Sequence, residues 1–258
     1  MPLNIAIIGS GPAGFYTADA LIKACPDCRI DFIERLPTPF GLIRGGVAPD
    51  HQTTKRVTQK YEKTAMMEHV HFYGNVEIGR DISLDELRQM YDAVVLAIGA
   101  PSDKKLTIPG ADKIGVHGSA AFVGWYNGHP DFRDLEPDLN TTAAVVIGNG
   151  NVAVDVARVL LRSPNGMAES DLPDHVSEII HAAPITDVYM VGRRGPADAK
   201  FTNVELREMG HLNMTAPRVL AYQMPEDLGA VLNQYDDRDR RLRTRNIETL
   251  KEFAECSD

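Results

Sequence analysis

Two glycine-rich segments of this chain have the spacing of loops that bind the pyrophosphate of a dinucleotide. Residues 9–14 (GSGPAG) follow an apolar run at 5–8, and residues 148–153 (GNGNVA) follow another at 143–147. Glycine lets the backbone approach a pyrophosphate closely, and the helix that follows presents its N-terminal amides to the anion. One such pattern is weak evidence, but two of them, each set between an apolar strand and a helix, predict two dinucleotide sites.

The residues that follow the two loops carry opposite charges. Glu34 ends the next apolar run after the first loop, 20 residues beyond Gly14, where a carboxylate accepts hydrogen bonds from a ribose. After the second loop, the apolar run 187–191 leads to Arg193 and Arg194 instead of an acid. Guanidinium groups bind a 2′-phosphate through charge-assisted, forked hydrogen bonds. The pattern therefore predicts FAD or NAD in the first site and NADP in the second.

The composition is that of a soluble enzyme. The 258 residues are 43% hydrophobic and 24% charged, which is enough for one large or two modest cores. No apolar stretch approaches membrane-spanning length and the first apolar run starts at Leu3, so we expect a cytoplasmic protein without membrane insertion. The net charge of -9 argues against nucleic acid as the main partner. Cys25 and Cys28 form a C-x-x-C pair, but no second pair completes a metal site, so we expect two surface thiols in a reducing compartment and no metal.

Strand and helix patterns alternate along the chain, which predicts an α/β fold with parallel sheets in two Rossmann-like units. Strands are expected near 3–8, 29–33, 71–76 and 92–98, and helices near 12–24, 54–67 and 83–90. Ser83 and Glu86 predict a capping box at the start of the last of these helices. A polar, irregular stretch around 125–127 is expected to lead to the second loop, and residues 163–184 to form an inserted loop. We place an FAD-binding unit at 1–103 and an NADP-binding unit at 104–258.

Several segments together resemble one family of flavoproteins. They are residues 9–16 (GSGPAGFY), 37–51 (PTPFGLIRGGVAPDH), 73–79 (YGNVEIG), 122–127 (FVGWYN), 148–158 (GNGNVAVDVAR) and 191–196 (VGRRGP). These segments resemble adrenodoxin reductase and its bacterial relatives, which are FAD-containing ferredoxin-NADP reductases. The resemblance implies hydride transfer between NADPH and FAD, followed by single-electron steps to a ferredoxin-type iron-sulfur protein. Family members continue well beyond residue 258, so we expect this sequence to be an N-terminal portion.

The resemblance assigns FAD contacts to residues of the first unit and to Trp125. The pyrophosphate contacts would be Gly9, Gly11, Pro12, Ala13 and Gly14, and Glu34 would bind the adenosine ribose. The residues that line the flavin would be Leu42, Gly45, Val47 and Trp125. Two of these side chains also have a purely structural interpretation. Glu34 could be an exposed strand-end acid, and Trp125 could be an ordinary core residue.

The resemblance also assigns NADP contacts to residues of the second unit and to His51. The pyrophosphate contacts would be Asn149, Gly150, Asn151 and Val152. Arg193 and Arg194 would bind the 2′-phosphate, and Glu205 the adenosine-side ribose or the neighbouring arginines. The groups around the nicotinamide, which orient the ring and handle a proton, would be His51, Asp155 and Glu208. Structural alternatives exist here too: His51 as a turn residue, Asp155 as an acid favoured by the helix dipole, and Glu205 as the partner of Thr202 in a capping box.

Two other functions fit the same motifs. One is an NADPH-oxidising flavoprotein subunit of a larger enzyme, such as that of glutamate synthase, although three cysteines cannot supply the iron-sulfur region expected there. The other is a non-catalytic nucleotide-binding fragment. Near the end of the chain, five arginines between 238 and 245 lie on an expected helix that also holds three aspartates. That helix is either a solvated face or a docking site for an acidic ferredoxin.

Overall fold

The computed structural model describes residues 2–255 and divides into two compact units, Met1–Leu135 and Glu136–Asp258. The first unit contains a four-stranded parallel sheet with the order β3-β2-β1-β4. The strands are β1 (Asn4–Ile8), β2 (Arg29–Ile33), β3 (Val70–Tyr73) and β4 (Ala93–Leu96). The second unit contains a two-stranded parallel sheet of β5 (Ala143–Ile147) and β6 (Asp187–Val191). The α/β class and the two parallel sheets predicted from the sequence are confirmed.

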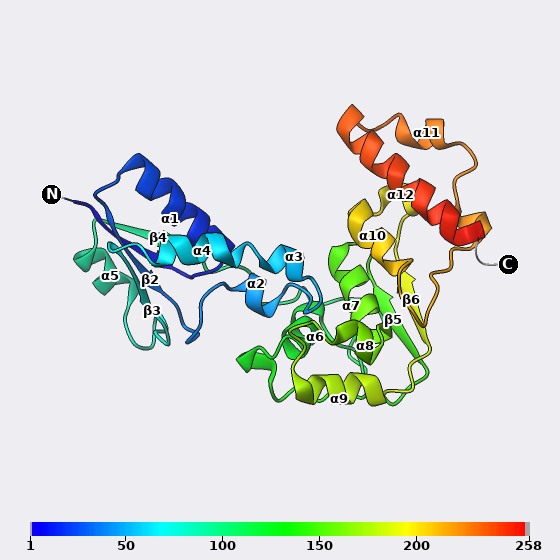
Figure 1. Cartoon of the computed structure of the whole chain (residues 1–258), viewed down its shortest axis with the longest axis horizontal. Helices are drawn as coiled ribbons and strands as arrows, with labels where there is room; N and C mark the ends of the chain where they lie inside the picture. The colour runs from blue at the N-terminus through cyan, green and yellow to red at the C-terminus, as the bar shows by residue number, and fades with distance from the viewer. Residues whose placement is uncertain (1, 256–258) are drawn as a thin grey trace. The chain divides into compact units, whose positions relative to one another are not determined.

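Alternate residues of β1 face opposite sides of the first sheet. Ile5 and Ile7 pack in a core with Phe15 of α1 (Pro12–Ala24) and Tyr61 of α4 (Thr58–Ala65). Ala6 and Ile8 pack on the other side, against the helix α5 (Leu84–Met90). Because both faces are covered, β1 is apolar from Ile5 to Ile8, which is the pattern of a central strand in a parallel sheet. Helices α1 and α4 accordingly lie along one face and α5 along the other (Figure 1).

Local signals in the first unit predict most of its elements well. Helix α1 begins at Pro12 and ends at Ala24 as expected, with proline in the first turn. The predicted capping box of α5 is present, since Ser83 accepts from the Glu86 N–H and Glu86 accepts from the Ser83 N–H. The prediction of a single helix at 54–67 is wrong. This part of the chain forms two helices, α3 (Gln52–Lys55) and α4, with a break at Arg56 and Val57.

The stretch around Trp125 is helical, so the prediction of an irregular segment there is wrong. Helix α6 (Ser119–Tyr126) has Phe122, Trp125 and Tyr126 among its buried residues. The carboxylate of Asp103 caps its first turn by accepting from the Ala120 N–H at 2.8 Å. A helix that is buried on every side has no polar stripe, so its sequence lacks the 3.6-residue periodicity that marks amphipathic helices.

The second unit has a covered and an uncovered sheet face. Val188 and Met190 of β6 pack against Val154 of α7 (Asn151–Leu161) and Leu206 of α10 (Asn203–Met209). The side chains that alternate with them are about half exposed: Val145, Ile147, Tyr189 and Val191. A two-stranded sheet is marginal by itself. The packing of α7, α10 and α12 (Asp237–Glu255) therefore supplies most of the apolar contacts in this unit.

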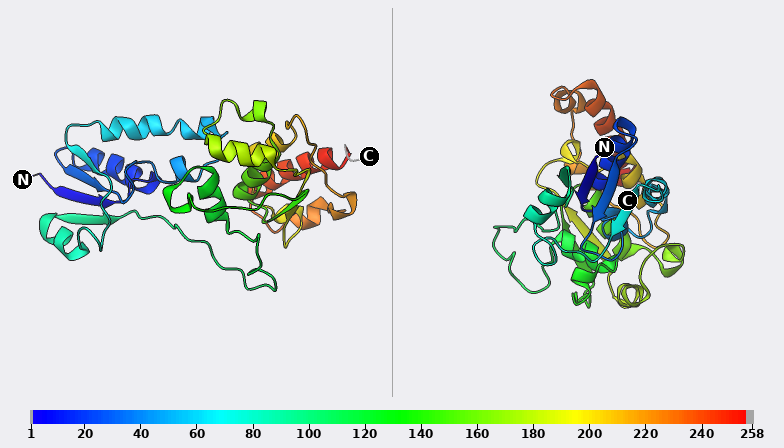
Figure 2. Two further views of the ribbon diagram at one scale, coloured as in Figure 1. Left: turned by 90° about the horizontal axis from the view of Figure 1, so that it is seen from below. Right: turned by 90° about the vertical axis from the view of Figure 1, so that its left-hand side faces the viewer.

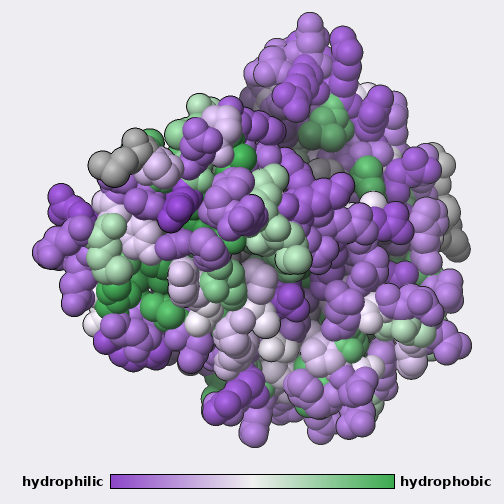
Figure 3. Space-filling model, turned by 60° about the vertical axis from the view of Figure 1, so that its left-hand side comes forward, coloured by the Kyte–Doolittle hydropathy of each residue, from purple (hydrophilic) through white to green (hydrophobic). Residues whose placement is uncertain are grey.

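The remaining helices are short. They are α2 (Leu42–Gly45), α8 (Pro164–Met167), α9 (Asp174–Ala182) and α11 (Leu228–Leu232), with 3-10 turns at Pro130–Phe132, Pro196–Asp198 and Ala221–Gln223 (Figure 2). Helices α8 and α9 lie within residues 163–184, so the expected inserted loop is itself partly helical. Hydrophilic side chains predominate on the face drawn in Figure 3. Among the described residues, no helix combines the length and the apolar character needed to cross a membrane.

Candidate functional site

The first glycine-rich loop turns sharply between β1 and α1. Gly9 has a φ of 101°, a backbone conformation that favours glycine, and its N–H donates to the Ile33 carbonyl at 2.8 Å. A Cβ on Gly14 would overlap the carbonyl oxygen of Gly9, so only glycine fits where the helix crosses the strand end. Gly11 caps α1 without any side-chain hydrogen bond to the first turn, which has no acidic residue. The first-turn amides of α1 are thus arranged as in helices that bind anions.

Glu34 is joined to this loop by two hydrogen bonds and to the segment after β2 by a third. Its carboxylate accepts from the Ser10 N–H at 3.0 Å, the Ser10 hydroxyl at 2.8 Å and the Leu36 N–H at 3.1 Å. Ser10 is fully buried. The acid predicted to bind a ribose therefore also fixes the loop predicted to bind the pyrophosphate, and these two parts of the predicted site are brought together.

The segment that follows β2 folds back onto the first loop. Phe40 has a φ of 88°, which is uncommon for a residue with a side chain, and its N–H donates to the Ser10 carbonyl at 2.9 Å. Its ring packs against that of Phe15, with 5.6 Å between the two ring centroids. A Cβ on Gly41 would come within 2.8 Å of the Gly11 Cα, so the two backbones touch. Sparsely populated backbone conformations of this kind persist where the surrounding packing enforces them, often at ligand sites.

The predicted flavin-lining residues occupy different settings within the first unit. Leu42 begins α2 and is 66% exposed, whereas Trp125 in α6 is 3% exposed and packs 5.3 Å from Phe122, between ring centroids. Gly45 ends α2, where a Cβ would meet the His129 ring. Val47 is half-buried, and its N–H donates to the Leu42 carbonyl. An exposed leucine beside the glycine loop is a side chain that a flat, apolar ring could cover.

His51 also belongs to the first unit. It is half-buried, stands at the N-cap of α3, and its N–H donates to the Ala48 carbonyl at 3.0 Å. Cys25 and Cys28 lie at the other end of α1 from the glycine loop and are free cysteines. The expectation of two surface thiols is wrong for Cys28, which is fully buried in the core that α1 covers. Burial raises the pKa of the Cys28 thiol, which disfavours the reactive thiolate.

The second glycine-rich loop repeats this plan between β5 and α7. Gly150 caps α7 without a side-chain hydrogen bond, and the first turn again has no acid. A side chain at Gly192 would overlap the Asn149 amide, so the loop passes directly against the turn after β6. Two hydrogen bonds hold the next segment to the loop: the Lys200 N–H donates to the Asn149 carbonyl at 2.8 Å, and the Thr202 N–H donates to Asn151 Oδ1 at 2.7 Å.

Both predicted phosphate-binding arginines are exposed in this turn. Arg194 lies 3.4 Å from the Asp198 carboxylate, and its side chain is 58% exposed. Asp198 also accepts a hydrogen bond from the Tyr235 hydroxyl at 2.8 Å, which raises the pKa of Tyr235. Arg193 makes no ion pair recorded within the described part of the chain. The turn therefore offers one pre-oriented guanidinium and one that extends into solvent, beside the second loop.

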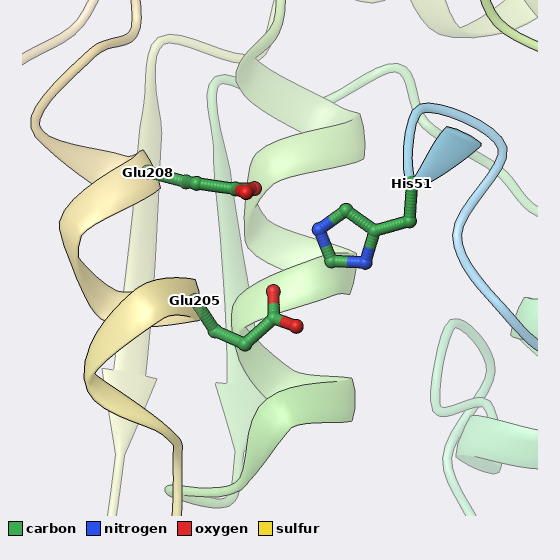
Figure 4. A group of neighbouring side chains, drawn as sticks. All are labelled: His51, Glu205 and Glu208. Carbon is green, nitrogen blue, oxygen red and sulfur yellow. The ribbon is translucent and has the colours of Figure 1, made fainter. Parts of the chain in front are cut away.

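A buried arginine gathers three acids in the same unit. The guanidinium of Arg158 lies 2.9 Å from Asp155, 3.5 Å from Glu205 and 3.2 Å from Glu208. Glu205 and Glu208 are one turn apart on α10 and project toward the same side of that helix (Figure 4). The Thr202 hydroxyl accepts from the Glu205 N–H, but the Glu205 carboxylate lies by Arg158, so only half of the predicted capping box is present. The structure thus brings together three predicted site residues from two helices.

Arg158 is a site residue that the sequence reasoning missed. It ends the segment 148–158 and follows Asp155 by three residues on α7, the spacing of an intrahelical ion pair. The signal in the sequence is its position among apolar neighbours, since Ala157 and Val159 are buried beside it. A charged residue in an apolar stretch of helix needs buried partners.

The fold and these loops define a protein with two dinucleotide-binding units. The family model for pyridine nucleotide-disulphide oxidoreductases matches residues 3–186. The chain belongs to this family.

Similar proteins confirm the predicted resemblance. The chain is 52% identical over 209 residues to the mitochondrial NADPH:adrenodoxin oxidoreductase of Arabidopsis thaliana, covering 81% of this chain and 43% of the relative. It is 44% identical over 263 residues to NADPH-ferredoxin reductase FprA of Mycobacterium tuberculosis, covering 98% and 56%. The structure of that FprA in complex with NADPH has a TM-score of 0.89 and 43% identity, and the match covers 99% of this chain and 56% of the other. The chain spans about half the length of the curated relatives it matches. Some of these relatives are described as mitochondrial, and the cytoplasmic location stays a prediction.

Removing the Glu34 carboxylate should destabilise the first unit. In a Glu34→Ala variant the buried N–H and hydroxyl of Ser10 lose their acceptor, so we expect the free energy of unfolding to fall by about 1–3 kcal/mol. Glu34→Gln keeps an acceptor oxygen and should lose less. Chemical denaturation measures both, with Glu62→Ala, an exposed position on α4, as the control expected to change stability by about 0.5 kcal/mol or less. Equal stability of Glu34→Ala and Glu62→Ala would contradict a structural role for the carboxylate.

Proposed function

We propose that this chain is the FAD- and NADP-binding part of an NADPH-dependent reductase of the ferredoxin-NADP reductase type. The observation that carries the proposal is the pairing of each glycine-rich loop with a different charge. Glu34 is hydrogen-bonded to the first loop, and Arg193 and Arg194 lie beside the second. A carboxylate suits the ribose of FAD, and guanidinium groups suit the 2′-phosphate of NADP. The likeness to FprA and to adrenodoxin oxidoreductase supports the same assignment.

The first loop and Glu34 bind the ADP half of FAD in this proposal. Leu42, Gly45, Val47 and Trp125 line the flavin. Bound FAD supplies the chemistry, accepting a hydride from NADPH and releasing electrons singly. The chain itself binds and orients the two nucleotides, and it needs no protein nucleophile for this reaction.

The second loop binds the NADP pyrophosphate, with Asn149 to Val152 at the α7 N-terminus. Glu205 serves the adenosine-side ribose or the neighbouring arginines. Asp155 and Glu208 orient the nicotinamide and handle a proton near it, and the resemblance gives His51 the same role. Asp198, which pairs with Arg194, lowers the affinity of this site for NADP, because an acid beside a 2′-phosphate weakens its binding.

We propose a ferredoxin-type iron-sulfur protein as the electron acceptor. Arg238, Arg241 and Arg245 are exposed on α12 at spacings of three and four residues, so they lie on one face of that helix. Other arginines of this helix are paired with its own acids, Arg240 with Asp237 and Arg243 with Asp239. The three exposed arginines, called the α12 arginine face below, fit an acidic partner.

Flavin and hydride chemistry are the first test of this function. The purified chain, reconstituted with FAD, should show flavin absorbance that NADPH bleaches under anaerobic conditions. The measurements are FAD affinity by fluorescence quenching and NADPH-ferricyanide turnover. NADP binding without any FAD binding would instead support a nucleotide-binding fragment without catalysis.

The coenzyme preference should depend on the two arginines beside the second loop. Replacing Arg193 and Arg194 together with alanine removes charge-assisted bonds worth roughly 1.5–3 kcal/mol each, so NADPH should bind more weakly by about two orders of magnitude or more. NADH lacks the 2′-phosphate, and its affinity should change little. Isothermal titration with both coenzymes measures this. Arg162→Ala, outside the turn after β6, is the control, and equal losses for NADPH and NADH would overturn the assignment.

Binding of an acidic ferredoxin should depend on salt and on the α12 arginine face. Replacing Arg238, Arg241 and Arg245 with glutamine should weaken binding and flatten its dependence on salt concentration. The positive charges attract an acidic partner, and salt weakens that attraction because the screening length is only about 10 Å at 0.1 M salt. Surface plasmon resonance at several salt concentrations measures both effects. The matched control is Lys251→Gln with Arg88→Gln, exposed basic residues outside this face. Identical salt responses for the triple variant and the unmodified chain would exclude docking at this face.

A further inference from the structure

The turn that joins α1 to β2 begins and ends with a cysteine. Cys25 is the C-cap of α1, where its N–H donates to the Leu21 carbonyl at 2.7 Å, and Cys28 directly precedes β2. The Cys28 N–H donates to the Cys25 carbonyl at 3.0 Å, which closes a turn of four residues. Pro26 stands at the second position of this turn, where proline is favoured. Backbone hydrogen bonds therefore hold both cysteines in place.

The same turn brings the two side chains together. A hydrogen-bonded turn places its first and fourth Cα atoms less than about 7 Å apart, and disulfides join cysteines whose Cα atoms are about 4.4–6.8 Å apart. Burial is the main cause of the raised pKa of Cys28, followed by the charge of Cys25 and a hydrogen bond between the two side chains. Both cysteines also pack in the core that contains Phe15 and Ile30. The backbone of the turn thus already suits a disulfide.

The two thiols differ in their access to solvent. Cys25 is half-buried, whereas Cys28 is 0% exposed. A reagent in solution therefore reaches the Cys25 sulfur first, and the Cys28 sulfur then meets whatever has become attached to Cys25. This is the arrangement of an attacking thiol with a resolving thiol beside it.

The cysteines lie at the opposite end of α1 from the loop proposed to bind FAD. The helix has 13 residues, so its two ends are about 20 Å apart at the usual rise per residue. Exchange between thiols and disulfides requires direct attack of one sulfur on another. The oxidant for this pair must therefore come from solution, and it must be small enough to reach Cys25.

We propose that Cys25 and Cys28 form a reversible disulfide by exchange with a low-molecular-weight disulfide such as oxidised glutathione. This inference does not depend on the proposed function. In the first step the Cys25 thiolate attacks one sulfur of the small disulfide, whose S–S bond breaks and releases one thiol. In the second step Cys28 loses its proton and attacks the Cys25 sulfur, and the second small thiol leaves with that proton.

The electrons and protons of this exchange balance. The two cysteines together lose two electrons and two protons, and the small disulfide gains both as it becomes two thiols. The new bond joins the C-cap of α1 to the residue before β2. It therefore fixes the far end of the helix and strand that carry the first glycine-rich loop and Glu34.

The experiment follows the thiols of the full, folded chain by mass spectrometry. The third cysteine, Cys256, lies outside the described residues, so every sample carries Cys256→Ser. The chain is incubated with oxidised glutathione at about pH 8.5, where cysteine thiols in general are partly ionised, and is then blocked with iodoacetamide. Both thiols should disappear, the mass should fall by that of two hydrogen atoms, and no glutathione should stay attached. Dithiothreitol should restore both thiols.

Two single variants separate the steps of the exchange. Cys28→Ala lacks the resolving thiol, so Cys25 should retain one glutathione. Cys25→Ser lacks the accessible thiol, so Cys28 should stay free while circular dichroism shows a folded chain.

Three results with the folded Cys256→Ser chain would overturn the proposal. They are two thiols that persist, a glutathione that remains on Cys25, and two chains joined through Cys25. Should either single variant fail to fold, the Cys256→Ser chain still decides, because its mass distinguishes each of these results from the internal disulfide.

Discussion

The close contact between a helix and the end of a strand is the constraint on which the first unit depends. The Gly9 carbonyl faces Gly14 so closely that no side chain fits between them, and the same turn directs the α1 amides away from the sheet. Everything proposed for FAD follows from this contact. Glu34 reaches the loop because β2 lies next to β1 in parallel register, with Ile8 opposite Ile33. The Glu34 carboxylate, which directly follows β2, is then placed beside the turn that follows β1.

The second unit uses the same backbone plan with other charges. Gly150 caps α7 as Gly11 caps α1, but the strand next to β5 ends in arginines where β2 ends in an acid. In the proposed function, the fold fixes where a dinucleotide can bind, and the residue after the neighbouring strand selects which dinucleotide binds. Asp198 modifies this selection, because it pairs with Arg194 while Tyr235 holds it in place.

Electrostatics within the second unit concentrate on α7 and α10. An apolar contact between these helices, through Val154 and Leu206, brings their charged residues together at its edge. Arg158 joins them there as the one described guanidinium that is fully buried. Replacing such a network with apolar residues commonly preserves stability, so the network is weak evidence for a role in folding alone.

The sequence alone determined the elements whose signals are local. Proline and glycine set the limits of α1, the Ser83 and Glu86 pair set the start of α5, and apolar runs located β1, β2, β5 and β6. Both glycine-rich loops and the charges of Glu34, Arg193 and Arg194 were readable because their chemistry follows from spacing along the chain. The resemblance to a reductase family supplied the roles of the other residues.

Only the tertiary structure decided the parts that depend on distant residues. Helix α6 was missed because it is buried on all sides, and its cap comes from Asp103, 17 residues before the amide that it accepts from. The pairing of Arg158 with Glu205 joins residues 47 positions apart, and nothing in either local sequence specifies that distance. Such pairs form when apolar packing places one helix against another, and the energy of a buried charge then depends on which partners that packing supplies.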